Sequence, residues 1–313
     1  VKTSELVAER LNAWGYQVTR GIGGTGLVGQ LKKGNGSKSL GIRADMDAPP
    51  ILERTGLPYA STVHGKMHAC GHDGHTAILL CAAKYLAESA DFNGTLNLIF
   101  QPAEENEGGA LRMVDEGLFD QFPCDQIFAL HNSPGLPVGQ LAMSKGPAMA
   151  SFDRVTVTLT GVSAHGAMPH HGVDPMQCVA SIVLGLQSIV GREINAQRSA
   201  VITVGAIQAG ETYNIVPELA TLKIGVRALD PRVREQLENR IQAFIQAQAT
   251  SYGLSCEIDY VRKYPVLVNV DEHIDFARDV AQELVGAERV YEREPAMGSE
   301  DFAYMLQAVP GAY

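Results

Sequence analysis

The chain has 313 residues, of which 45% are hydrophobic, and this length predicts two domains. Its formal net charge of −10 argues against a nucleic-acid backbone or an anionic membrane surface as a partner. No apolar run approaches membrane-spanning length, no signal-peptide pattern is seen, and the five scattered cysteines are typical of free thiols, so we expect a cytoplasmic protein.

The first segment, residues 3–16, has the apolar spacing of an amphipathic helix. Thr3 or Ser4 would cap the start of this helix, and Gly15 would end it. Its buried face is expected to consist of Leu6, Val7, Leu11 and Trp14.

A glycine-rich run at residues 21–26 separates two extended runs, 17–19 and 27–31. A phosphate-binding loop would lead into a helix and carry a Lys-Ser or Lys-Thr pair, and this run does neither. The pattern therefore predicts a hairpin turn.

Three apolar runs in the first half of the chain predict buried strands at residues 40–44, 94–101 and 125–130. Because these runs alternate with helical stretches, we expect an α/β sheet, in which sites gather at the carboxyl ends of the strands. The polar residues that follow the three runs are Asp45 and Asp47, Glu104 and Glu105, and His131.

The densest cluster of reactive side chains lies at residues 67–75, which hold one thiol, three imidazoles and one carboxylate. A predicted helix follows directly, with a buried face formed by Ile78, Cys81, Ala82 and Tyr85. Cys70 and His72 would lie at the start of that helix, where the dipole favours a thiolate. The pair is a plausible start for a transition-metal site, and a histidine-rich surface loop is the alternative.

From residue 151 the patterning changes to strict alternation, as in an antiparallel strand with one solvated face. Two strand–helix–strand halves follow, so we expect an α+β sandwich at residues 151–262. It would be inserted into a first domain made of residues 1–150 and 263–313. The predicted strands of the sandwich are 152–160, 200–207, 219–228 and 254–261, and its predicted helices are 174–190 and 231–249.

Eight short motifs, spread over the chain in order, resemble the M20 metallopeptidase family. The resemblance is to its amidohydrolase branch, which includes hippurate hydrolases, N-acyl-amino-acid deacylases and plant auxin-conjugate hydrolases. The motifs are RADMDA at 43–48, MHACGHD at 67–73, QPAEE at 101–105, ALHN at 129–132, AHGAMPH at 164–170 with DP at 174–175, NIVP at 214–217, Arg227 with Asp230, and MGSEDF at 297–302.

The resemblance implies a zinc-peptidase-like α/β catalytic domain with a mixed sheet, and an inserted α+β sandwich that acts as a lid and often forms a homodimer. It implies hydrolysis of the amide bond of N-acyl amino acids, such as benzoyl or acetyl derivatives. The chemistry would use two divalent metal ions, Mn²⁺ or Zn²⁺, which supply a nucleophilic water and stabilise the oxyanion.

By the same resemblance, Cys70 bridges the two metal ions, and the further ligands are His72, Glu105 and His131. Glu104 is implied as the general base that later protonates the leaving amine. A solvated pair of acids at a helix start is the alternative for the two adjacent glutamates.

Other roles are also implied. Asp47 would orient His72, while Asp45 stands where the wider family has a histidine and is not assigned as a ligand. His68 and His75 are assigned supporting or structural roles, and the thiols other than Cys70 are assigned to the core.

In the lid, His165 would donate to the oxyanion of the substrate. Asn214 and Arg227 would hold its free carboxylate, the arginine through a bidentate fork. A strand-edge salt bridge is the alternative for Arg227.

Two family motifs lie outside the sequence: an amino-terminal His-Pro-Glu segment and a last metal-ligand histidine beyond a final strand. We therefore expect the chain to be incomplete and to lack one ligand.

Two other functions remain open. One is an amidase with a Cys70 nucleophile and His72 as base, for which the spacing is poor and which leaves two carboxylates without roles. The other is a metal-free binding protein that keeps the fold.

Overall fold

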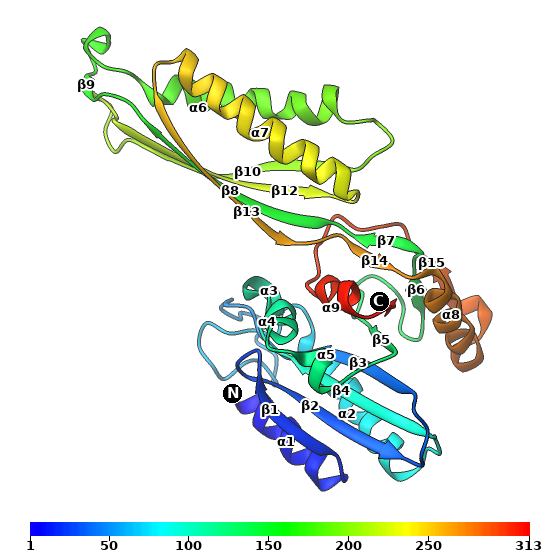
Figure 1. Cartoon of the computed structure of the whole chain (residues 1–313). Coiled ribbons are helices and arrows are strands. Elements are labelled where there is room, and N and C mark those ends of the chain that lie inside the picture. The colour runs from blue at the N-terminus through cyan, green and yellow to red at the C-terminus, as the bar shows by residue number, and fades with distance from the viewer. The chain divides into compact units, whose positions relative to one another are not determined.

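The structure is a computed structural model that describes residues 1–313, except for the side chain of Asn106. It divides into two compact units (Figure 1). Unit 1 consists of Val1–Ala148, Leu267–Glu294 and Glu300–Tyr313, and unit 2 consists of Met149–Val266 and Pro295–Ser299. The inserted unit therefore begins two residues before the predicted position, and the patterning of the sequence did not indicate that residues 295–299 join it. Among the described residues, no helix is long and apolar enough to cross a membrane.

Unit 1 is built on a six-stranded mixed sheet with the order β1–β2–β4–β3–β5–β16. Strands β1, β2 and β4 pair antiparallel, and the pairs β4–β3, β3–β5 and β5–β16 are parallel. The predicted hairpin is present between the first two strands. The strands are β1 (Gln17–Ile22), β2 (Gly26–Lys33), β3 (Ser39–Asp45), β4 (Gly94–Gln101), β5 (Gln126–Ala129) and β16 (Gly311–Ala312).

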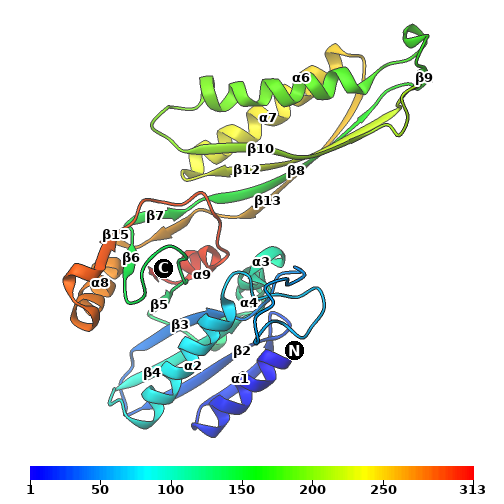
Figure 2. The ribbon, with the colours of Figure 1, turned by 180° about the vertical axis from the view of Figure 1, so that it is seen from behind.

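Helices α1 (Lys2–Ala13) and α2 (His72–Glu88) pack against each other and against the sheet of unit 1 (Figure 2). Side chains on alternate positions of a strand point to opposite faces. In β4, Leu98 and Phe100 face the core shared with the two helices, whereas Gln101 points to the other face and contacts Asp301. The face of β4 that carries Gln101 thus points away from the two helices and can contribute polar groups to a site.

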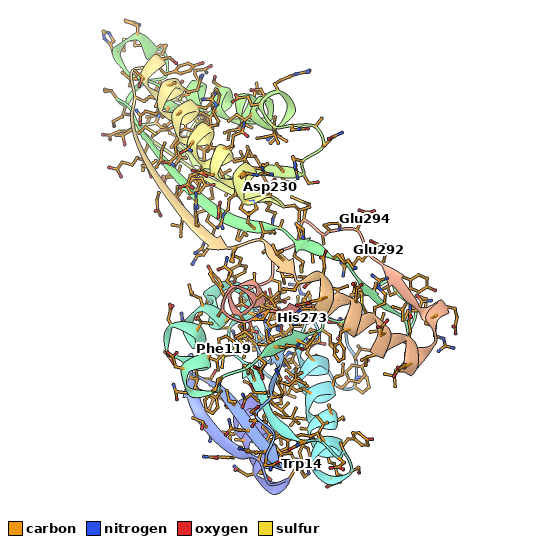
Figure 3. All side chains as sticks on the ribbon, turned by 45° about the vertical axis from the view of Figure 1, so that its right-hand side comes forward. Trp14, Phe119, Asp230, His273, Glu292 and Glu294 are labelled. Carbon is orange, nitrogen blue, oxygen red and sulfur yellow. The ribbon has the colours of Figure 1, made fainter. Side chains whose placement is uncertain are left out.

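Two predicted helix faces are wrong in part. In α1, Val7 and Leu11 are buried but Leu6 is 48% exposed, and neither Thr3 nor Ser4 caps the helix, which begins after Val1. Trp14 follows the end of α1 (Figure 3).

In α2 the buried positions differ from those predicted. The helix begins at His72, and the side chains at three- and four-residue spacing from His72 are the buried ones. Ile78 and Tyr85 are 49% and 63% exposed, and Cys81 is exposed. The buried stripe consists of His72, His75, Thr76, Leu79 and Ala83.

Unit 2 is a two-layer sandwich with the four-stranded antiparallel sheet β10–β12–β8–β13. Helices α6 and α7 cover one face and share its apolar core (Figure 1). The strands are β8 (Ser151–Thr160), β10 (Ala200–Ala209), β12 (Leu219–Ala228) and β13 (Ser255–Tyr264), and the helices are α6 (Pro175–Ser188) and α7 (Pro231–Ser251). The order β8–α6–β10 and β12–α7–β13 confirms the two predicted halves.

Both helices of unit 2 begin with an Asp-Pro pair. The carboxylates of Asp174 and Asp230 accept hydrogen bonds from backbone N–H groups of the first turn, and proline occupies the first helical position. Asp230 is labelled at the start of α7 in Figure 3. The remaining elements of the chain are α3 (Glu104–Glu107), α4 (Gly109–Asp115), α5 (Leu118–Gln121), β6 (Leu141–Met143), β7 (Gly146–Met149), β9 (Ala164–His165), β11 (Ile215–Val216), β14 (Leu267–Asn269), α8 (Asp271–Val285), β15 (Val290–Glu292), α9 (Phe302–Ala308), and the short turns η1 (Pro169–His171), η2 (Ile189–Glu193) and η3 (Ala287–Arg289).

Candidate active site

The candidate site lies at the carboxyl ends of the parallel strands β3, β4 and β5, beside the start of α2. The parallel strands end at the same edge of the sheet, so the polar residues that follow them converge there. The helix starts after Gly71, whose φ of 86° is a left-handed conformation that glycine adopts without strain. This turn brings Cys70 and His72 to the strand ends, as the spacing predicted.

The side chains of the predicted metal ligands lie close together. Ligand atoms of Cys70, His72 and His131 all lie within 4.8 Å of one another, and the same limit holds for His72, Glu104 and Glu105. His72 Nε2 lies 4.0 Å from Glu105 Oε1. Atoms bound to one ion at about 2.0–2.3 Å are separated by distances of this size.

Two buried atoms in this group have no hydrogen-bond partner among the described residues: His72 Nε2 and Glu105 Oε1. An unsatisfied buried polar atom costs about 1–3 kcal/mol, so two such atoms that face each other need an explanation. A shared cation supplies one. The residues therefore fit a divalent metal ion, with a soft thiolate and borderline imidazoles beside a carboxylate.

The ring orientations of the two histidines agree with this role. The Nδ1 of His72 lies 3.0 Å from Asp47 Oδ1, and Asp47 Oδ2 also accepts the backbone N–H of Glu105. The Nδ1 of His131 lies 2.7 Å from the carbonyl oxygen of Asn132. In both rings Nδ1 would carry the proton, which leaves the lone pair of Nε2 for an ion.

His75 is buried and both of its ring nitrogens are engaged. Its Nδ1 lies 2.6 Å from Asp45 Oδ1, and its Nε2 accepts the backbone N–H of Asn132 at 2.9 Å. Asp45 is in turn paired with Arg43 at 3.0 Å. The partners of Asp45 and His75 are therefore protein groups.

Glu104 lies in a buried acidic group that the sequence analysis did not assign. Its carboxylate is within 4.8 Å of those of Glu300 and Asp301. Burial, followed by repulsion from these two acids, raises the pKa of Glu104 to about 10. The signal in the sequence was the GSED motif, which was recognised but given no role. A solvated pair of acids is wrong for Glu104, because the residue is only 7% exposed.

The sequence predicted that the dipole of α2 would favour the thiolate form of Cys70, but other effects on the pKa of this thiol are larger. Burial, followed by a hydrogen bond with Glu105 and the charges of Glu105 and Glu104, raises the pKa of the thiol to about 12. The neighbouring acids thus outweigh the dipole unless a cation lies among them. A Cys70 nucleophile activated by His72 gains no support from this environment, since His72 is oriented by Asp47 instead.

The three predicted lid residues do not converge within one unit. His165 in β9 is exposed and pairs with Ile215 in β11, next to Asn214. Arg227 lies near the other end of β12, opposite Phe152. At about 3.3 Å per residue, the length of strand between these two ends is about 25 Å. Asn214 and Arg227 of one subunit are therefore too far apart to hold the same carboxylate together.

Arg227 lies on an inner strand, so the alternative of a strand-edge salt bridge is wrong. Its Nη1 donates to the carbonyl oxygen of Met297 at 2.9 Å, and the guanidinium lies 4.6 Å from the centre of the Phe152 ring. The nearby acid Asp230 pairs with Arg198 and Arg232 instead. Partial burial lowers the pKa of Arg227.

The strand ends of this mixed α/β sheet hold a thiol, two imidazoles and two adjacent glutamates. Two buried ligand atoms among them, His72 Nε2 and Glu105 Oε1, have no hydrogen-bond partner among the described residues. This arrangement defines a metal-dependent hydrolase. The chain belongs to the peptidase family M20/M25/M40, whose model matches residues 41–313.

Comparison with curated relatives places the chain in the amidohydrolase branch, as predicted. It is 45% identical over 312 residues to a hippurate hydrolase of Campylobacter jejuni, covering 99% of this chain and 81% of the relative. It is 37% identical over 313 residues to an N-acetyl-L-cysteine deacetylase of Bacillus subtilis, covering 100% of this chain and 74% of the relative.

The fold is confirmed by a solved Bacillus subtilis structure described as a dinuclear metal binding peptidase of the M20 family. The two structures have a TM-score of 0.83 at 31% identity, covering 100% of this chain and 81% of that chain.

Proposed function

We propose that this protein hydrolyses the amide bond of N-acyl amino acids and releases a carboxylic acid and a free amino acid. The observation that carries the proposal is the pair of orphaned buried atoms, His72 Nε2 and Glu105 Oε1, beside the thiol of Cys70 and the carboxylate of Glu104. The similarity to a hippurate hydrolase and an N-acetyl-L-cysteine deacetylase supports this substrate class.

Cys70, His72, Glu105 and His131 would hold two divalent metal ions, Mn²⁺ or Zn²⁺. Such ions polarise the scissile carbonyl and make a water molecule more acidic. Asp47 keeps His72 in the required tautomer and orientation.

Glu104 would take the proton from the attacking water and later give it to the leaving amine. Burial and the two neighbouring acids favour uptake of a proton by Glu104, and a cation held by the adjacent ligands would lower its pKa towards the working pH, as a general base requires. The adjacent Glu105 would be neutralised by the cation, so two consecutive glutamates can have different tasks.

We further propose that the protein acts as a homodimer through its lid. His165 lies in the two-stranded sheet β9–β11, beyond the start of β12, whereas Arg227 lies near the end of β12, so a single lid cannot present both to one small substrate. Two subunits remove this conflict if Arg227 binds the substrate's carboxylate and His165, with Asn214, comes from the other subunit's lid.

A chelator test separates the three candidate functions. We expect prolonged treatment with a chelator to abolish hydrolysis of N-benzoyl-, N-acetyl- and indoleacetyl-amino acids, and Mn²⁺ or Zn²⁺ to restore it. Metal-independent activity that thiol alkylation blocks would instead support the Cys70 nucleophile. A protein that retains no metal and turns over none of these substrates would be a binding protein.

Arg227→Lys is expected to raise KM at least tenfold for substrates with a free carboxylate, because a lysine ammonium cannot replace the bidentate fork. Matched substrates whose carboxylate is converted to an amide should show little change in KM. The measurement is KM for both substrate types in the variant and in the unchanged protein. Equal effects on the two types would remove Arg227 from the substrate site.

A further inference from the structure

Arg43 is a fully buried cation at the end of β3 that the proposed mechanism does not use. Its Nη1 lies 3.0 Å from Asp45 Oδ2, and its Nη2 lies 2.8 Å from Glu300 Oε1 and 3.2 Å from Asp301 Oδ1. Its Nε donates to Gln101 Oε1 at 2.8 Å. One guanidinium therefore contacts three carboxylates from two distant parts of the chain.

The carboxylates around Arg43 would repel one another without it. Asp45, Glu300, Asp301 and Glu104 are all buried, and burial of several negative charges is stable only when cations and hydrogen bonds compensate them. The planar guanidinium can serve several carboxylates at fixed angles, which a lysine ammonium cannot do.

Hydrogen bonds from protein groups orient Glu300 and Asp301. Glu300 Oε2 accepts from the hydroxyl of Tyr313 at 2.9 Å. Asp301 accepts from the side-chain amide of Gln101 at 2.7 Å and from the backbone N–H of Ala110 at 2.9 Å. These acids are thus held rigidly, as expected of groups that position others.

The network of Arg43 reaches both sides of the candidate site. On one side, Asp45 Oδ2 lies 3.6 Å from His72 Nε2, and Asp45 Oδ1 holds the ring of His75. On the other side, the backbone N–H of Asp301 lies 3.4 Å from Glu104 Oε1. Arg43 is therefore the one side chain that connects His72, a proposed metal ligand, with Glu104, the proposed base.

We propose that Arg43 is a positioning residue: by holding Asp45 on one side and Glu300 and Asp301 on the other, it fixes the carboxylate of Glu104 relative to His72. Arg43 contacts neither substrate nor metal in this scheme. The inference rests on the proposed function, in which Glu104 is the general base. A displacement of about 1 Å in such a group is enough to lower a rate by about 10².

Arg43→Lys keeps the charge but removes the fork, and we expect it to lower kcat about 10²-fold with KM within about threefold and metal content unchanged. Gln101→Leu removes both the acceptor of Arg43 Nε and the amide that donates to Asp301, so it loosens the network while the charged side chains stay in place. For this variant we expect a loss of about tenfold in kcat.

Arg234→Lys is the matched control. Arg234 forms an ion pair with the buried Asp153 in unit 2, and it has no role in the proposed site. Its replacement should reduce thermal stability but leave kcat within about twofold. A folding defect in Arg43→Lys would be measured by the same melting experiment, and Gln101→Leu would then provide the kinetic comparison.

Crystal structures of the variants supply a readout that does not depend on turnover. We expect the Glu104 carboxylate to shift by about 1 Å relative to Glu105 in Arg43→Lys. An unshifted carboxylate, or a kcat equal to that of the unchanged protein, would overturn the inference. So would a fall in kcat that merely follows a fall in bound metal. If the unchanged protein hydrolyses no acyl amino acid, the proposed function fails, and the position of Glu104 in the variants still decides whether Arg43 positions it.

Discussion

Glu104→Gln is expected to lower kcat by a factor on the order of 10²–10⁴ while metal content stays nearly the same. The amide has the shape of the carboxylate but cannot accept a proton from water. Because burial and the nearby Glu300 and Asp301 disfavour a negative charge at position 104, a neutral amide is compatible with the site, and the variant should fold at least as stably as the unchanged protein. Turnover, bound metal and melting temperature are the quantities to measure.

The two neighbouring glutamates of α3 provide controls for the same substitution. Glu105→Gln should reduce metal retention, because it removes one of the proposed ligands. Glu107→Gln should change neither metal nor turnover, since its side chain is 65% exposed and pairs only with Arg112 among the described residues. If Glu104→Gln loses metal as readily as Glu105→Gln, the division of roles between the two residues is wrong.

His165→Ala is expected to lower kcat about 10²-fold or more without a change in metal content, as the loss of one oxyanion donor does. His165 is exposed at the end of β9, and its Nδ1 accepts the backbone N–H of Ala167. This contact leaves Nε2 as the nitrogen that can donate to a substrate oxygen. Near-normal turnover in the variant would make His165 a structural residue.

A mixing experiment tests whether His165 acts on its own subunit's site or on that of a partner. His165→Ala and Glu104→Gln are each expected to be nearly inactive. If the lid acts on the partner's site, each mixed dimer contains one intact site, and an equal mixture should recover about a quarter of the unchanged activity. No recovery after subunit exchange would show that the proposed arrangement between subunits is wrong.

Much of the fold could be predicted from local patterns. The alternation of β12 gave its limits, residues 219–228, and the helices predicted at 174–190 and 231–249 begin within one residue of α6 and α7. The predictions of which face of each helix is buried were less accurate. The buried face of α2 was placed on Ile78 and Tyr85, which are 49% and 63% exposed, because sequence spacing alone does not show where a helix begins its contact with the sheet.

The candidate site was predictable where its residues lie close in sequence or follow strands. Cys70, His72, Glu104, Glu105 and His131 were named from their places at a helix start and at strand ends, and their side chains do lie together. Glu300 and Asp301 were missed as neighbours of Glu104, since nearly two hundred residues separate them and no periodicity links them.

The sequence by itself therefore determined the ligand types, the order of strands and helices, and the family. These depend on short-range spacing and on residue chemistry, which a linear pattern records. Only the tertiary structure decided that Arg43 joins Asp45 to Glu300 and Asp301, and that Asn214 lies beside the β9–β11 pair while Arg227 lies near the far end of β12. Both depend on contacts between segments that no local pattern relates: Glu300 and Asp301 reach Arg43 from just before α9, and the place of Asn214 depends on the pairing of β11 with β9.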